Sequence, residues 1–370
     1  MLEVADILRR YGDGYLQKFG NKMLPSQHRA FADILNCRTA VMGGHIYQCD
    51  QCGHQHYAYH SCRNRSCPKC HKNDTAAWLE QRRQELLNSQ YYHVVFTLPE
   101  QLRRVVRLHQ KTLYKILMKA AAQAVIKLAR DQHYVGGLIA VMSILHTSSR
   151  TLEYHPHVHC LIPAGGIASD RQHWLAARGN YLVSVKALSK VFRGIFTDMV
   201  RSTLHHLELP VSVRHKDWLV YCKPTHQGPD KVLNYLARYV HRGAIANSRI
   251  IAIEDGKVTF RYKPVKGSES KTMTLNAHEF IRRFLQHVLP KGVHKVRYYG
   301  LWAPANRQCL TKMQGLLAGN NNNDVPALQQ QHADTTQTQL TPLPQLKCPR
   351  CKTGTLVWLE RIPRQGRAPP

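Results

Sequence analysis

The stretch Tyr154–Pro163, which reads YHPHVHCLIP, contains the densest run of histidines in this 370-residue chain. It is expected to form a β-strand, in which alternate side chains lie on the same face of the sheet. His157 and His159 therefore share one face, and two imidazoles on one face can bind a divalent cation. The alternative is a histidine-rich strand that binds no metal.

An apolar run at residues 138–147 precedes this strand. The polar segment Ser148–Glu153 separates the two runs, and this pattern is typical of a β-hairpin. His146 lies near the end of the first run, so the hairpin makes it the candidate third ligand from across the ladder. The sequence thus predicts a metal site built from His146, His157 and His159.

The chain is strongly basic, with 52 lysines and arginines against 23 aspartates and glutamates and a net charge of +29. This excess favours a polyanionic partner, nucleic acid before membrane, and argues against an ordinary metabolic enzyme. No stretch approaches the roughly 20 apolar residues of a membrane span, and the N-terminus has no signal-peptide core. A cytoplasmic protein with no membrane partner is therefore expected.

Six of the eleven cysteines lie between residues 37 and 70, and four of them form two CxxC pairs. Because cytoplasmic thiols stay reduced, such pairs point to metal rather than to disulfides. Two CxxC turns can complete one tetrahedral zinc site of four thiolates. The predicted ligands are Cys49, Cys52, Cys67 and Cys70, with Cys62 and His71 as alternates.

The remaining cysteines receive weaker interpretations. Cys37 is expected to be a buried free cysteine, which is common for a lone cysteine. Cys348 and Cys351 form a third CxxC pair near the C-terminus, where only half of a site is visible. The other half would come from another chain, or the pair is a vestige.

The residues around the first zinc pairs are basic and aromatic. The run Tyr57–Arg65 reads YAYHSCRNR, and it offers guanidinium groups for phosphates and rings that stack on bases. Arg63 and Arg65 are therefore candidate DNA-binding residues. The alternative is a purely structural knuckle whose folding energy comes from the metal.

A pair of tyrosines lies in the segment YLARYVHR, which is expected to be helical. Tyr235 and Tyr239 are four residues apart and so share one helix face. Spaced aromatics usually pack in a core, but Arg238 and Arg242 argue against a buried face because arginines are rarely buried without a partner. A phenol beside a divalent cation can attack a phosphodiester, so both tyrosines are candidate nucleophiles.

The rest of the chain alternates predicted helices and strands. Helices are expected in 1–36 and at 76–90, 100–130, 186–207, 229–242 and 274–290, and strands at 91–98, 138–147, 154–162, 218–222, 250–253 and 258–262. Residues 313–346 contain no lysine or arginine and are rich in Asn, Gln and Thr. That composition is typical of a disordered linker.

Together these motifs resemble the HUH endonuclease superfamily, and most closely its two-tyrosine rolling-circle transposases of bacterial insertion sequences. The resemblance spans roughly residues 15–305, and its motifs occur in the family's order. They are YQCDQCGH…SCRNRSCPKC (47–70), VVFTLP (94–99), YHPHVHCLIPAGG (154–166), LNYLARYVHRGAIANSRI (233–250) and HKVRYYGLWAP (294–304).

The resemblance implies an α+β fold, namely a ferredoxin-like nuclease core with an antiparallel sheet, preceded by a small zinc-binding module. The expected division is a helical and zinc-binding DNA-binding domain at 1–90 and an HUH-type nuclease domain at 91–305. A disordered linker at 313–346 and a C-terminal tail with its CxxC pair at 347–370 would follow.

The resemblance also implies an activity, namely cleavage and rejoining of single-stranded DNA by tyrosine-mediated transesterification during rolling-circle transposition. Tyr235 and Tyr239 would be the nucleophiles, His157 and His159 would bind catalytic Mg²⁺ or Mn²⁺, and zinc would be structural. Arg238 and Arg242 would contact DNA. The implied partners are single-stranded element ends, target DNA and the host replication machinery, at the bacterial nucleoid.

Two other functions fit parts of the sequence. A plasmid replication initiator or relaxase would use the same chemistry on a different DNA. A non-catalytic, zinc-dependent DNA-binding regulator would form no covalent adduct with DNA.

Overall fold

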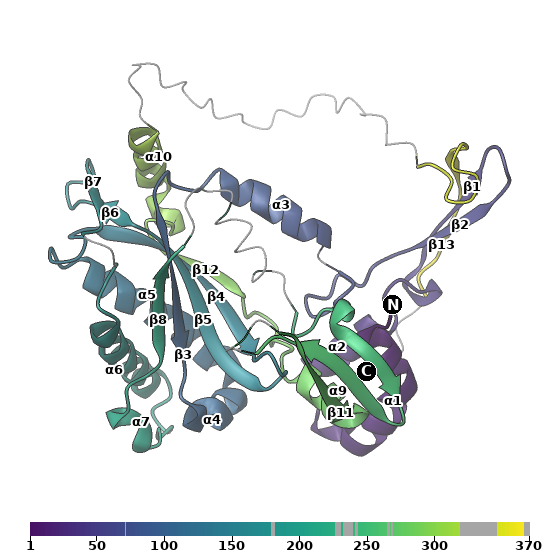
Figure 1. Cartoon of the computed structure of the whole chain (residues 1–370), viewed down its shortest axis with the longest axis horizontal. Coiled ribbons are helices and arrows are strands. Elements are labelled where there is room, and N and C mark those ends of the chain that lie inside the picture. The colour runs from purple at the N-terminus through teal and green to yellow at the C-terminus, as the bar shows by residue number, and fades with distance from the viewer. Residues whose placement is uncertain are drawn as a thin grey trace.

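The computed structural model contains a large sheet lobe, a smaller helical lobe and a slender three-stranded sheet beyond it (Figure 1). The helix α3 (Lys72–Arg83) runs from the side of the slender sheet back to the large lobe. The described residues are 1–70, 72–178, 182–225, 231, 240, 243–264, 267, 269–318 and 346–365, with side chains described for all of these except 72–77.

The large sheet has seven strands in the described part of the chain, and each is antiparallel to its neighbours. Six of them follow the order β7-β6-β4-β5-β3-β8, and the seventh, β12, pairs with β4. The strands are β3 (Tyr91–Thr97), β4 (Leu138–Ser148), β5 (Tyr154–Pro163), β6 (Gly165–Ile167), β7 (Trp174–Ala176), β8 (Val220–Pro224) and β12 (Val296–Gly300).

The centre of this sheet has the ferredoxin-like arrangement. The chain passes through β3, α5 (Gln110–Ala129), β4, β5, α6 (Val185–Thr203) and β8, while the spatial order is β4-β5-β3-β8. Each helix thus connects two strands that have one other strand between them. The short helices α4 (Arg103–Leu108) and α7 (Ser212–His215) lie beside these connections. The predicted α+β class with an antiparallel sheet is confirmed.

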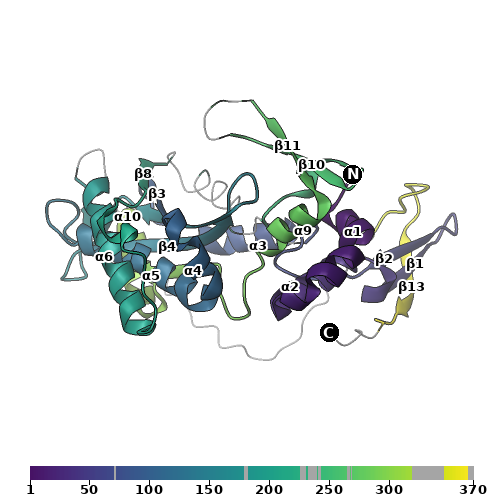
Figure 2. The same ribbon diagram turned by 90° about the horizontal axis from the view of Figure 1, so that it is seen from below.

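Helices α5 and α6 cover one face of the large sheet (Figure 2). Phe96, Leu145 and Val158 point to this face and share one buried core with the two helices. The ring of Phe96 lies 4.8 Å from that of Phe192 on α6, measured between centroids. This burial of apolar area anchors the strands that carry the histidines.

The opposite face of the sheet is covered only in part. Met142, Ile144 and Leu161 pack there with α10 (Arg307–Leu317) and with the chain near Leu301. His146 follows Ile144 by two residues, so it points to this same face, beyond the apolar core. The histidines therefore lie where the covering layer ends.

The helical lobe joins the N-terminal helices to a segment from the second half of the chain. Its elements are α1 (Val4–Phe19), α2 (Pro25–Leu35), α9 (Ala277–Leu285), β9 (Ile250–Glu254), β10 (Lys257–Tyr262) and β11 (Lys271–Asn276). Ile7 and Phe31 share a buried core with Phe260 and Phe280. The elements β9, β10, β11 and α9 thus pack with the N-terminal helices, which differs from a nuclease domain that is continuous from 91 to 305. The apolar faces of α1 and α2 are buried against each other and against α9.

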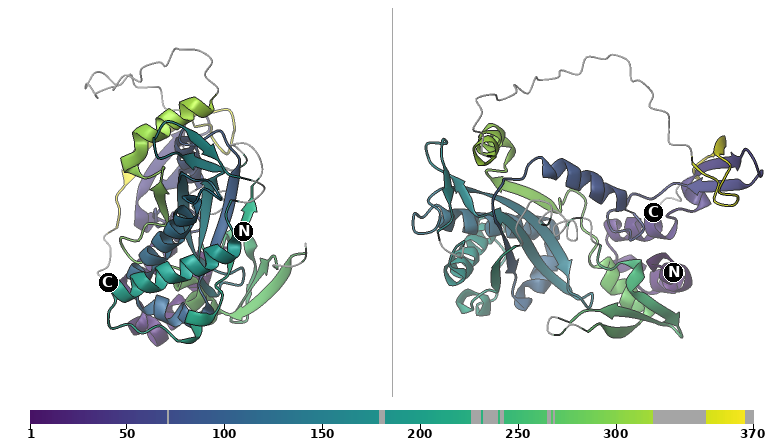
Figure 3. Two further views of the ribbon diagram at one scale, coloured as in Figure 1. Left: turned by 90° about the vertical axis from the view of Figure 1, so that its left-hand side faces the viewer. Right: turned by 45° about the horizontal axis from the view of Figure 1, so that its top comes forward.

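The slender sheet has the order β13-β1-β2, with β1 at Gly44–Cys49, β2 at Gln55–Tyr59 and β13 at Leu356–Ile362. The C-terminal segment is therefore not a separate tail but a strand of the zinc-binding module (Figure 3). Residues 313–317 belong to α10, so the expected linker does not begin at residue 313. Residues 319–345 lie outside the described part of the chain. None of the described helices has the length and apolarity needed to cross a membrane.

Candidate metal centre and cysteine clusters

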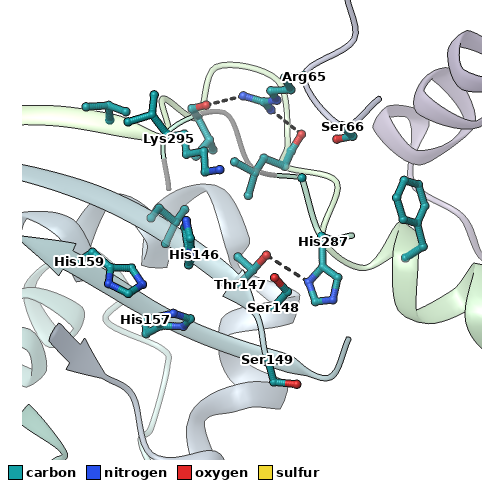
Figure 4. Close-up of a pocket in the computed structure, with 18 of the residues that line it drawn as sticks. Arg65, Ser66, His146, Thr147, Ser148, Ser149, His157, His159, His287 and Lys295 are labelled. Carbon is teal, nitrogen blue, oxygen red and sulfur yellow. Dashed lines mark hydrogen bonds between the residues drawn. The ribbon is translucent and has the colours of Figure 1, made fainter. Parts of the chain in front are cut away.

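Three histidines meet on the open face of the large sheet. His146 on β4 is paired directly with His157 on β5, and His159 follows two residues later. One ring nitrogen from each of the three lies within 4.8 Å of the others. Figure 4 shows the three rings turned toward one another inside a pocket. The predicted hairpin is confirmed, and it brings His146 to the pair as the sequence indicated.

Hydrogen bonds orient two of these imidazoles. The Nδ1–H of His157 donates to the carbonyl oxygen of His155 at 2.7 Å, which leaves Nε2 for a metal. The Nδ1 atom of His159 lies 2.8 Å from the Nε2 atom of His93 on β3. Partners of this kind fix the tautomer and the ring orientation of metal-binding histidines.

His93 was not identified as a site residue from the sequence. It lies in the apolar strand YYHVVFT, where a single histidine carries no spacing signal. Its position follows only from the pairing of β3 with β5, which places His93 opposite Leu161 and so on the face of His159. Pairing between strands so far apart in the chain cannot be predicted from one sequence.

Burial keeps these imidazoles neutral. Desolvation lowers the pKa of His157 to about 4 and that of His93 to about 4, and it holds the pKa of His159 well below its usual value. The neutral imidazole is the form that binds a metal. His157 and His159 are therefore in their ligating state at neutral pH.

The histidines line a cavity of about 660 Å³ whose other walls combine apolar, hydroxyl-bearing and basic side chains. Arg150, Arg249 and Lys295 line it as well, and no acidic side chain does among the described residues. Such a cavity attracts a polyanion and raises its local concentration. The arrangement suits a phosphodiester held beside a cation.

Arg65 reaches the same cavity and has a structural task there. Its guanidinium donates to the carbonyl oxygens of Leu289 at 2.6 Å, Pro290 at 2.7 Å and Val293 at 2.6 Å. Figure 4 shows two of these bonds. The side chain thus holds the loop between α9 and β12. Arg63, the other candidate DNA-binding arginine, is exposed and lines a second cavity near the slender sheet.

The predicted tyrosine nucleophiles lie outside the described residues. These are Tyr235 and Tyr239, and the neighbouring Arg238 and Arg242 are outside them too. The adjacent Val240 is described, is 6% exposed and lines the cavity of the three histidines. Gly243 and Ala244 line that cavity as well.

The cysteines form two clusters instead of the single predicted site. Each cluster brings four sulfur atoms within 4.8 Å of one another. One cluster is Cys37, Cys62, Cys67 and Cys70, and the other is Cys49, Cys52, Cys348 and Cys351. The expected grouping of Cys49 and Cys52 with Cys67 and Cys70 is therefore wrong.

The reason is the course of the chain between the two pairs. Cys49 and Cys52 lie at the tip of the β1–β2 hairpin, whereas Cys67 and Cys70 lie at the helical lobe and share its apolar core. Cys62, the alternate ligand, and Cys37, the expected free cysteine, both belong to the cluster that contains Cys67 and Cys70. His71, the other alternate, lies outside the described residues.

Comparisons with known proteins agree with this organisation. Residues 140–309 match the family described as "Putative transposase", and residues 7–98 match the "Transposase zinc-binding domain". "Putative transposase y4qJ" of Sinorhizobium fredii is 38% identical over 382 residues, covering 97% of this chain and 95% of its own length. "Transposase for insertion sequence element IS801" of Pseudomonas savastanoi pv. phaseolicola is 28% identical over 294 residues, covering 75% and 70%. No solved structure matches the chain.

The matched regions contain the main features of the site. The zinc-binding region holds six of the eight clustered cysteines, which supports structural zinc, while Cys348 and Cys351 lie outside both regions. The transposase region contains the three histidines and both predicted tyrosines. The chain therefore belongs to the family of insertion-sequence transposases in which a zinc-binding domain precedes the transposase region.

Proposed function

We propose that this transposase cuts and rejoins single-stranded DNA by metal-dependent transesterification, with Tyr235 and Tyr239 as nucleophiles, during rolling-circle transposition. One observation carries the proposal: the three-histidine cluster and Val240 line the same basic cavity. Val240 is the chain neighbour of Tyr239, and consecutive Cα atoms are only about 3.8 Å apart. A tyrosine beside this cavity could reach a phosphate held there.

The donor set fits a catalytic divalent cation. His146, His157 and His159 supply three nitrogen ligands, and three protein ligands leave positions open for substrate. Imidazole is a better ligand for transition metals than for Mg²⁺, so we favour Mn²⁺ of the two expected ions. When bound, such a cation would polarise the phosphate and stabilise the charge on the leaving oxygen.

The chain's own residues would carry out the exchange of bonds. The phenol oxygen of one tyrosine attacks the phosphorus and loses its proton to solvent. A P–O bond to tyrosine forms, and the bond to the DNA 3′ oxygen breaks. The 3′ oxygen gains a proton, which leaves a 5′-phosphotyrosine and a free 3′-hydroxyl. The number of phosphodiester-type bonds is unchanged, so the reverse step can rejoin strands without ATP.

The charged walls would hold the DNA during both steps. Arg150 and Arg249 flank the cavity, and the guanidinium of Arg249 donates to the carbonyl oxygen of Arg150 at 2.8 Å. With a net charge of +29, the protein suits element ends and target DNA at the bacterial nucleoid. The free 3′-hydroxyl is a primer for the host replication machinery.

The test is the formation of a covalent adduct with single-stranded element ends labelled on the 3′ side of the cleavage site. Incubation with Mn²⁺ should give a labelled protein band that resists denaturant. The double variant Tyr235→Phe/Tyr239→Phe should give none, whereas Tyr221→Phe on β8 should match the wild type. An adduct in the double variant would return both tyrosines to a structural role. The relaxase alternative predicts cleavage of a transfer origin in preference to element ends.

A further inference from the structure

We propose that Cys49, Cys52, Cys348 and Cys351 form a second structural zinc site, which fastens the C-terminal segment to the β1–β2 hairpin and completes a groove for single-stranded DNA. The zinc site stands on its own geometry. The assignment of single-stranded DNA to the groove rests on the proposed function, which names that DNA as the substrate.

The sulfur atoms have the spacing of a metal site. Cys49 Sγ lies 3.6 Å from Cys351 Sγ, and Cys52 Sγ lies 3.7 Å from Cys348 Sγ. A tetrahedral zinc with Zn–S bonds of about 2.3 Å places its sulfurs about 3.8 Å apart. Disulfide-bonded sulfurs would be only about 2.05 Å apart. The two CxxC turns therefore face one another as the halves of one zinc site.

Backbone amides support the thiolates in the same way on both turns. The N–H of Cys52 donates to Cys49 Sγ at 3.5 Å, and the N–H of Gly354 donates to Cys351 Sγ at 3.3 Å. Donors of this kind orient metal ligands and tune their basicity. A Cβ on Gly354 would lie 2.5 Å from Cys49 Sγ, so the close approach of the two turns requires glycine there.

Side chains of the first turn also tie the two turns together. Asp50 Oδ1 accepts from the N–H of Thr355 at 2.8 Å. Gln51 Oε1 accepts from the hydroxyl of Thr353 at 2.8 Å. These bonds fix the position of one turn against the other.

The buried apolar area of the slender sheet is too small to hold the C-terminal strand without a metal. The core of this sheet consists of Cys49, Cys348 and Leu356, with little else packed against it. Val357 and Trp358 of β13 are 56% and 57% exposed. Modules with so little buried area usually depend on metal for their folding energy.

The docked strand completes a second cavity, of about 990 Å³. Arg38 and Arg63 come to it from the N-terminal module, and Arg361 and Arg364 come from the C-terminal segment. No acidic side chain lines this groove among the described residues. Guanidinium groups bind phosphate oxygens in a bidentate way, so the groove suits a phosphate backbone.

Two tyrosines make the groove better suited to a single strand than to a duplex. Tyr57 and Tyr59 line it, and their rings stack with centroids 6.2 Å apart. Tyr57 is 48% exposed, which leaves a ring available to an unpaired base. Stacking on aromatic rings beside a basic groove is the usual way in which proteins hold single strands without reading their sequence.

Metal content of the full chain tests the zinc site. Cys348→Ser/Cys351→Ser should contain one zinc fewer per chain than the wild type, whereas Cys222→Ser/Cys309→Ser, outside both clusters, should be unchanged. Iodoacetamide footprinting of the wild type gives a readout that needs no variant. Cys49, Cys52, Cys348 and Cys351 should resist alkylation together and become reactive together on chelation. Unchanged zinc in the first variant, or alkylation of Cys348 and Cys351 alone, would overturn the site.

Salt-dependent binding of a single-stranded oligonucleotide tests the groove. Arg361→Gln/Arg364→Gln keeps every zinc ligand, and each lost phosphate contact lowers the salt slope by about 0.7, so the slope should fall by about 1.4. Arg201→Gln/Arg214→Gln, with the same change of charge in the large lobe, should lower it by less. An equal decrease of the salt slope in the two double variants would overturn the proposal that the groove binds single-stranded DNA. Because neither assay measures cleavage, their failure is distinguishable from failure of the covalent-adduct test.

Discussion

The Nε2 atom of His93 lies 2.8 Å from the Nδ1 atom of His159, and the planes of the two rings are only 7° apart. His93 is a positioning residue, because it holds a metal ligand without reaching the metal itself. Replacing such a partner typically weakens metal binding about 10- to 100-fold. We expect His93→Ala to weaken Mn²⁺ binding by that factor, as measured by the electron paramagnetic resonance of free Mn²⁺. His93→Gln should restore part of the affinity, and the exposed His133→Ala should have no effect.

His157 and His159 should be required for cleavage but not for DNA binding. Each imidazole supplies one metal ligand, whereas affinity for DNA comes mainly from basic residues. The double variant His157→Ala/His159→Ala is expected to bind a single-stranded oligonucleotide within about twofold of the wild type and to give no cleaved product with any divalent cation. Cleavage by the wild type in excess chelator would contradict the assignment.

The two tyrosines should contribute unequally. Val240, the neighbour of Tyr239, lines the metal cavity, so we expect Tyr239→Phe to lose most of the covalent adduct. Tyr235→Phe should keep single-strand cleavage and lose the later strand transfer, which needs a second nucleophile. Quantifying adduct and joined product in one time course separates the steps. Equal losses of adduct in both variants would remove this division of labour.

His287 should make stability depend on pH. Its Nε2–H donates to the carbonyl oxygen of Leu152 at 3.1 Å, its Nδ1 accepts from the hydroxyl of Thr147 at 3.1 Å, and burial lowers its pKa to about 4. Between pH 6.5 and 4 the unfolded chain binds a proton that the folded chain does not. This contribution, at most about 3 kcal/mol, is therefore present above pH 6.5 and is lost as the pH falls toward 4.

Urea unfolding at a series of pH values provides the measurement. We expect His287→Gln to be less stable than the wild type at pH 7, and the difference in the free energy of unfolding should shrink by pH 4.5. A difference that stays constant across this range would show that the His287 side chain does not titrate on unfolding.

The two arginines near the zinc-binding module should separate stability from DNA binding. Arg65 donates to three carbonyl oxygens, so Arg65→Ala should lower the free energy of unfolding by about 2 kcal/mol or more. Arg63, which like Arg65 is exposed, lines the second cavity, so Arg63→Ala should weaken oligonucleotide binding with little change in stability. Thermal unfolding and anisotropy measured on the same samples test both. Loss of stability in Arg63→Ala together with loss of DNA binding in Arg65→Ala would contradict both assignments.

Local patterns made much of the large lobe predictable. The alternation of His157 and His159 determines which face they share, and one polar turn between two apolar runs was enough to bring His146 beside them. Such features depend on residues close in sequence and on the period of a strand. The predicted strands at 250–253 and 258–262 were recovered for the same reason, and Asp255 and Gly256 form the tight turn between them.

Long-range pairing was not predictable. Cys52 has Cys348 as its neighbour, 296 residues away, and nothing in the spacing of one sequence favours this pairing over the nearer Cys67. The packing of Phe260 into the core that it shares with α1 and α2 likewise depends on which apolar faces remain uncovered after each element has formed. A CxxC pair indicates half of a metal site but does not indicate which other residues complete it.

The pairing of β13 with β1 also has a consequence for biosynthesis. Cys351 leaves the ribosome 302 residues after Cys49, which at about 5 to 20 residues per second is a delay of about 15 to 60 s. During that interval the hairpin has two unmatched thiols and an unpaired strand edge. An element copy that has lost the 3′ end of its gene would still encode the histidine centre. Its product would lack Cys348, Cys351 and β13, so it could form neither this four-cysteine cluster nor the pairing of β13 with β1. Such remnants would retain the cutting machinery and lack one of the surfaces that hold its substrate.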